Sequence, residues 1–321
     1  MQKWAMRMGA IAGVILLGFA QGGVTAADDK FRVVASIRPV AALVGAVMGD
    51  VGQPALLISD PAAAHHFTVK PSQARLLQHA DLVFWIGPSM ETTLGTALAG
   101  LAPDVPAIPL IDSDGLTRYP LDVTDHDNGP KHSGETAQSH HAHHDHGVNP
   151  HIWLDPRNVV ILLHHVADRL AAADPAHKAS YQANARNAAA EIEATIAAMR
   201  AEMAHYRNSR FIVLHDAHVY FERFFDVRAR AVITIDPDTA PGAARVTALR
   251  QTVATAKITC IFGEVGIPDK WPQLVAGGHH LSLVQLDPLG ITIGDGPGFF
   301  PRLFRLYQTA YRDCLKGDKT G

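Results

Sequence analysis

The amino-acid sequence predicts an α/β protein with two lobes, each a four-stranded, mostly parallel sheet flanked by helices, joined by a long rigid helix. Three observations support this fold class. Strand patterns alternate with helix patterns up to about residue 116, which is typical of βαβ units. An alanine-rich helical segment follows at 175–207, and the alternation then restarts and continues to residue 314. No sequence repeat relates the two halves, so we expect their similarity to be architectural.

The first half contains four short apolar runs of the length expected for buried strands. These runs lie at 31–37, 54–58, 81–87 and 105–111. Helical patterns separate them, at 39–48, 71–80 and 90–99. The second of these helices opens with Pro71, a residue that suits the first turn of a helix because its missing N–H group has no partner there anyway.

Two helices are predicted in the middle of the chain. One covers 156–172 and follows the Asp155-Pro156 dipeptide, and the other covers 175–206 without glycine or proline after its first residue. At 1.5 Å per residue the second would be about 45 Å long, which exceeds the width of one small domain. We expect residues 175–207 to be a rigid spine between the lobes.

The second half repeats the alternation of strands and helices. Strand patterns lie at 210–215, 230–235, 258–264 and 281–286, and helical patterns at 218–224, 241–255, 269–276 and 297–314. The predicted organisation is therefore a first lobe at 27–174, the spine at 175–207 and a second lobe at 208–321.

The first 26 residues have the pattern of an export signal. Lys3 and Arg7 precede an apolar run at 8–20, and Val24–Ala26 fits a small-residue cleavage site. The run is too short to span a bilayer, although a retained membrane anchor is the alternative. We expect the mature protein to be soluble in the bacterial periplasm.

The chain has two cysteines, Cys260 and Cys314. In an oxidising compartment such a pair indicates a disulfide, and two free buried thiols are the alternative. A disulfide here would close a loop of about 55 residues, which is worth about 4 kcal/mol in the chain-entropy model. The net charge of −3 and the lack of a basic stripe exclude a nucleic-acid-binding surface.

Histidine is unusually frequent, with 19 residues, of which eight lie between His126 and His151. The surrounding segment, 117–149, has almost no apolar residue, so we interpret it as a mobile surface loop. We expect this loop to bind additional metal weakly, and a solvated linker without a metal role is the alternative. Its weak-site candidates are His140, His141, His143, His144 and His146.

Ligand-type side chains also follow several predicted strands, where ligands bind in open α/β sheets. His65 or His66 follows the second strand, and His151 follows the polar loop. His215 ends the first strand of the second lobe, and Asp287 ends the last one. Any single histidine after a strand is more often a surface or capping residue, and Asp287 before a proline could simply begin a turn. Their joint occurrence with a histidine-rich tract and an export signal favours a metal site, and a cleft between the lobes would let them converge, although their spacing alone does not establish this.

Four segments in this order resemble one known family. They are HHFTVKPSQARLLQHADLVFWIGPSME, NPHIWLDP, LHDAHVYFE and LDPLG. Over about residues 30–314 the sequence resembles the metal-binding solute-binding proteins of bacterial ABC transporters, specifically their zinc-uptake branch. The resemblance implies four ligand positions, namely His65, which stands six residues before Pro71, and His151, His215 and Asp287.

One position departs from the pattern of the branch. Some zinc-binding members carry an acidic residue just before the first ligand histidine, where this chain has Ala64. Asp287 or water must therefore complete the ligand shell. The resemblance also places a disulfide where Cys260 and Cys314 stand.

The ligand set favours zinc as the metal. Three imidazoles with one carboxylate or water suit four-coordinate Zn²⁺, whereas manganese prefers more oxygen ligands. The manganese branch of the family usually has glutamate at the third position, which is His215 here. Copper(II) and nickel(II) accept the same donors, so the ligand set does not select against them.

The resemblance implies a monomeric periplasmic carrier, not an enzyme, that captures Zn²⁺ with high affinity. It would deliver the ion to a membrane permease driven by an ATPase. A manganese or other divalent-metal carrier of the same fold is one alternative. The other is a periplasmic zinc hydrolase with Glu264 or Glu222 as general base, although the HExxH motif is missing.

Overall fold

The computed structural model describes residue 1 and residues 31–60, 67–121, 147–234 and 239–316. The predicted export signal lies outside the described residues. The same holds for His65, His66 and the histidines of the predicted loop from His126 to His146. Within the described residues, no helix is both long enough and apolar enough to span a bilayer.

The first sheet consists of four parallel strands in the order β2-β1-β3-β4. They are β1 (Val33–Ala35), β2 (Ala55–Leu56), β3 (Leu82–Trp85) and β4 (Ala107–Pro109). The helices are α1 (Arg38–Met48), α2 (Pro71–Gln78) and α3 (Leu94–Leu101). Every predicted strand is present but shorter than its apolar run, because the run continues into buried loop residues such as Leu57 and Ile86.

The second sheet repeats this topology, with parallel strands in the order β6-β5-β7-β8. Its strands are β5 (Phe211–His215), β6 (Ala231–Thr234), β7 (Cys260–Glu264) and β8 (Ser282–Leu286). Its helices are α6 (Val219–Phe225), α7 (Ala243–Thr255), α8 (Lys270–Ala276) and α9 (Phe299–Leu315). The predicted fold class of two four-stranded α/β units is confirmed.

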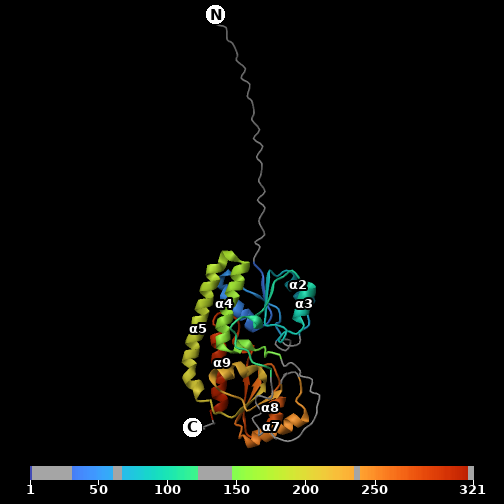
Figure 1. Cartoon of the computed structure of the whole chain (residues 1–321), viewed down its shortest axis with the longest axis vertical. Helices are drawn as coiled ribbons and strands as arrows, with labels where there is room; N and C mark the ends of the chain where they lie inside the picture. The colour runs from blue at the N-terminus through green and yellow to red at the C-terminus, as the bar shows by residue number, and fades with distance from the viewer. Residues whose placement is uncertain (2–30, 61–66, 122–146, 235–238, 317–321) are drawn as a thin grey trace. The chain divides into compact units, whose positions relative to one another are not determined.

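The two long central helices are α4 (Pro156–Ala173) and α5 (Lys178–Ala204). Helix α5 has 27 residues, which makes it about 40 Å long. It begins at Lys178 because Pro175–His177 forms a separate 3-10 turn. Helix α5 packs against α4 and α1 from the first half and against α9 from the second (Figure 1). One helix therefore contributes to the packing of both halves.

Both ends of the segment 117–149, predicted to be a mobile loop, are ordered, and its residues 122–146 lie outside the described residues. Pro120 and Val148 form an antiparallel bridge, and the Leu121 N–H donates to the carbonyl oxygen of Gly147 over 2.9 Å. The Tyr119 ring packs against that of Tyr220, with 5.1 Å between centroids. A polar segment can thus be ordered where one aromatic residue anchors it.

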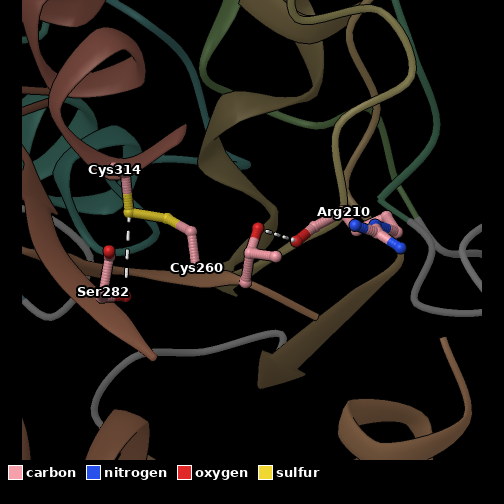
Figure 2. Close-up of a disulfide and its surroundings, with 5 residues drawn as sticks. Arg210, Cys260, Ser282 and Cys314 are labelled. Atoms are coloured by element: carbon pink, nitrogen blue, oxygen red, sulfur yellow. Dashed lines mark hydrogen bonds between the residues drawn. A yellow bond between two sulfur atoms is a disulfide. The ribbon is translucent and has the colours of Figure 1, made fainter. Parts of the chain in front are cut away.

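The two cysteines form a disulfide, so the alternative of free thiols is wrong. Figure 2 shows the bond between Cys260 on β7 and Cys314 on α9, whose Cα atoms are 5.6 Å apart. The Cys314 sulfur lies 3.8 Å from the carbonyl oxygen of Ser282 on β8. The disulfide therefore joins the last helix to the second sheet at a buried contact.

Candidate metal centre

Strand alternation determines which way His215 and Glu264 face. Successive side chains of a strand point to opposite faces of the sheet, so every second residue shares a face. Phe211 and Val213 on β5 share a face with His215, and Cys260 and Phe262 on β7 share a face with Glu264. These four side chains pack in one core cluster. The residues between them, such as Ile212 and Ile261, pack in a second cluster beneath α7 and α8. His215 and Glu264 continue the first face at the carboxyl ends of neighbouring parallel strands.

The imidazole of His215 meets the carboxylate of Glu264. The Nδ1 atom of His215 lies 2.7 Å from Oε2 of Glu264. Both side chains are buried, with His215 1% and Glu264 7% exposed. A carboxylate at Nδ1 favours a proton on that nitrogen, which leaves the lone pair on Nε2.

A second buried histidine faces the same carboxylate oxygen. The Nε2 atom of His218 lies 4.0 Å from Oε2 of Glu264, and its Nδ1 atom is 2.9 Å from the hydroxyl of Tyr307. Burial, together with the neighbouring His215, lowers the pKa of His218 well below its usual value. The His218 ring is therefore neutral and carries a single N–H group.

His151 lies just before a 3-10 turn (Ile152–Leu154) that leads into α4, and Asn149 orients its ring. The amide nitrogen of Asn149 donates to the backbone oxygen of Asp216 over 2.6 Å and to its carboxylate over 3.1 Å. The amide oxygen of Asn149 must then face His151, whose backbone N–H donates to it over 3.1 Å. The same oxygen is 2.9 Å from Nδ1 of His151, so the proton of this ring is also on Nδ1.

The two ligand-type imidazoles approach each other through their Nε2 atoms, which are 3.4 Å apart. Two nitrogens bound tetrahedrally to Zn²⁺ at 2.0–2.1 Å are about 3.3–3.4 Å apart. Because both Nδ1 atoms face acceptors, both Nε2 atoms present lone pairs to the same point. The pair therefore fits a shared metal ion in spacing, orientation and protonation.

Asp287 is buried and held by its own loop. Its carboxylate accepts hydrogen bonds from the backbone N–H groups of Ile291 (2.9 Å) and Thr292 (2.8 Å), and from the Thr292 hydroxyl (2.7 Å). The indole N–H of Trp153 donates to the backbone oxygen of Pro288 over 2.8 Å, which joins this loop to the segment of His151. The loop thus stands beside the histidine segment, with its carboxylate oriented by three donors.

The described residues bring two of the four predicted ligands together. His151 and His215 meet, whereas no group of three or more His, Cys, Asp or Glu side chains in the described part of the chain is arranged to hold a metal. Asp287 does not join the two histidines in such a group, and His65 lies outside the described residues. The orienting roles of Asn149 and Glu264 were not predicted from the sequence. The one signal for Glu264 is its place at the carboxyl end of a strand.

Two parallel α/β sheets, a shared long helix and an imidazole pair formed by the end of β5 and the turn before α4 define the chain as a two-lobed metal-binding protein of the solute-binding class. The model of the family described as "Zinc-uptake complex component A periplasmic" (ZnuA) matches residues 33–310, and the chain belongs to this family. It is similar to the high-affinity zinc uptake system protein ZnuA of Brucella abortus, with 35% identity over 326 residues, covering 95% of this chain and 97% of the relative.

Solved structures with much lower sequence identity share the fold. A Zn(II)-bound variant of AdcAII from Streptococcus pneumoniae gives a TM-score of 0.72 at 20% identity, covering 88% of this chain and 99% of that chain. The protein FpvC of Pseudomonas aeruginosa in complex with Mn²⁺ gives 0.73 at 19% identity, covering 89% and 99%. These likenesses show the fold alone. Family membership identifies a periplasmic zinc-binding component of an ABC-type uptake system and not an enzyme, so the hydrolase alternative is wrong.

Proposed function

We propose that this chain binds its cargo Zn²⁺ through the Nε2 atoms of His151 and His215. His65 is the third ligand in this proposal, and Asp287 or a water molecule completes the shell. The observation that carries it is the 3.4 Å separation of the two Nε2 atoms, with each Nδ1 atom facing an acceptor. Family membership supports zinc as the cargo, and three imidazoles suit four-coordinate zinc.

The site binds and releases the ion without making or breaking covalent bonds in a substrate. The neutral imidazoles donate lone pairs, and their burial excludes water from that side of the ion. In this proposal the protein acts as a monomer in the periplasm after removal of its export signal. It delivers the ion to the membrane permease of the uptake system, which an ATPase drives.

Isothermal titration of the metal-free mature protein with Zn²⁺ tests the ligand assignment. We expect one tight site in the wild type, and the loss of that site in His151→Ala and in His215→Ala, since each removes one of the two oriented nitrogens. His205→Ala is the matched control, because this exposed histidine lies at the end of α5. A tight isotherm that survives both ligand substitutions would contradict the assignment.

Competition between Zn²⁺ and Mn²⁺ tests the choice of cargo. Nitrogen ligands favour zinc over manganese, so we expect Zn²⁺ to displace bound Mn²⁺ and an excess of Mn²⁺ not to displace Zn²⁺. Displacement of Zn²⁺ by a moderate excess of Mn²⁺ would instead support the manganese carrier of the same fold.

A further inference from the structure

We propose that Glu264 is a positioning residue for the metal site, because its carboxylate holds the His215 ring with Nδ1 protonated and Nε2 facing the metal. His218 lies 4.0 Å from the same carboxylate oxygen and is itself in contact with Tyr307. The proposal rests on the proposed function, in which His215 is a zinc ligand. It adds a buried network of Glu264, His218 and Tyr307, whose side chains support the ligand without binding the metal.

The first observation is the position of Glu264 in the sheet. Glu264 is the last residue of β7. Val213 of β5 pairs with Phe262 of β7, so two residues further along both strands the same register places Glu264 opposite His215. The contact of 2.7 Å between Oε2 and Nδ1 is short, although its angles fall outside those of an aligned hydrogen bond. The N–H group at Nδ1 carries a partial positive charge, so the carboxylate attracts it at this distance, and the attraction is strong because both groups are buried.

The second observation is the chemistry that this contact imposes on the ring. A neutral imidazole that binds a metal through Nε2 must keep its proton on Nδ1. A carboxylate at Nδ1 stabilises that tautomer, fixes the ring plane and makes Nε2 a better electron-pair donor. Without the carboxylate, the buried ring could move its proton to Nε2 and block the metal.

The third observation is the support that Glu264 itself receives. The hydroxyl of Tyr307 on α9 lies 2.9 Å from Nδ1 of His218, and Nε2 of His218 lies 4.0 Å from Oε2 of Glu264. The last helix, the turn after β5 and the end of β7 therefore each contribute one side chain to this buried group, namely Tyr307, His218 and Glu264.

The test uses the full mature protein with two substitutions, Glu264→Gln and Glu264→Ala, and one matched control, Glu222→Gln. Glu222 is another buried glutamate, on α6, whose Oε2 accepts a hydrogen bond from the backbone N–H of Ala229 over 2.9 Å. Glu264→Ala is expected to weaken zinc binding by about 10–100-fold, the usual effect of losing such a partner, and Glu264→Gln by less. Glu222→Gln is expected to leave zinc affinity unchanged.

Two further measurements separate positioning from general destabilisation. Histidine ring ¹⁵N chemical shifts of the metal-free protein should show His215 protonated on Nδ1 in the wild type and in Glu222→Gln, and a mixture of tautomers in Glu264→Ala. The visible absorption bands of bound Co²⁺ should change in Glu264→Ala and not in the control. If Glu264→Ala does not fold, the same two measurements on Glu264→Gln decide.

Unchanged affinity, tautomer and Co²⁺ bands in both Glu264 variants would overturn the proposal. Failure of the wild type to bind zinc tightly is a different result, since it would overturn the zinc site itself. The tautomer measurement needs no metal, so it can separate the two failures.

Discussion

Single side chains at this site are constrained by what their neighbours already donate or accept. The amide nitrogen of Asn149 donates both of its hydrogen bonds to Asp216, and this orientation presents the amide oxygen of Asn149 to His151. Aspartate at this position would place a second carboxylate against Asp216, which is costly in a buried site. The first half also has a fully buried acid, Glu91, which lies in the turn between β3 and α3.

Glu91 leads to a prediction about the pH dependence of stability. Its carboxylate accepts from the Ser36 hydroxyl and from the backbone N–H groups of Ile86 (3.2 Å) and Gly87 (3.0 Å). Burial nevertheless raises the pKa of Glu91 from 4.5 to about 7. The folded protein then holds this proton more tightly than the unfolded chain does. The contribution of Glu91 to the free energy of unfolding is therefore fully present below pH 4.5 and is lost as the pH rises through 7.

The free energy of unfolding should therefore fall between pH 4.5 and pH 7 by about 2–4 kcal/mol more in the wild type than in Glu91→Gln. Urea unfolding of the metal-free protein at several pH values measures this difference. Glu193→Gln, an exposed acid on α5, is the control that should follow the wild type. Parallel curves for the wild type and Glu91→Gln would show that Glu91 does not titrate in this range.

At the scale of elements, strand register and disulfide decide how the second lobe is assembled. The pairing of β5 with β7 brings the ends of both strands to the site, and the disulfide attaches α9 to the same sheet. Helix α9 carries Tyr307 into the network of Glu264, so its attachment and the geometry of the site are linked. The disulfide is nevertheless at the opposite, amino-terminal end of β7.

The double variant Cys260→Ala/Cys314→Ala tests this separation. Loss of a cross-link spanning 54 residues should lower the free energy of unfolding by about 4 kcal/mol. Zinc affinity at moderate temperature should change little, because the bond lies four residues from Glu264 at the far end of the strand. Chemical unfolding and zinc titration of the same preparation measure both quantities, and a large loss of affinity with intact folding would contradict the separation.

At the scale of the whole molecule, the His151 segment is attached to the second half of the chain. Asn149 bonds to Asp216 and to the hydroxyl of Tyr220, whose O–H donates to the Asn149 carbonyl oxygen over 2.7 Å, and Trp153 bonds to the loop after Asp287. His151 and His215 therefore share one framework, although 64 residues separate them. These contacts join residues 149–153 to the second half of the chain, and none of them involves a residue of 124–146.

Deletion of residues 124–146 tests the independence of this pair from the loop. The deletion keeps Gly147, whose carbonyl oxygen accepts from Leu121, and so leaves the ordered ends in place. We expect a lower total zinc stoichiometry, because the loop histidines are gone, and an unchanged tight site. Zinc titration measures both, with a Gly/Ser segment of equal length as the control. Loss of the tight site in both variants would show that the loop is the primary site.

The sequence by itself determined the strands, the helices, the disulfide pair and the histidines at the strand ends, because apolar periodicity and motif spacing are local properties. It also placed His151 apart from the histidines of the loop. Only the tertiary structure decided that β5 and β7 pair in the register that puts Glu264 against His215. It alone showed that Asn149, fixed by Asp216, turns His151 toward the same point. The tautomer of His215 depends on Glu264, and the orientation of Asn149 beside His151 depends on Asp216. Both partners are distant in the chain, and no local pattern of residues encodes them.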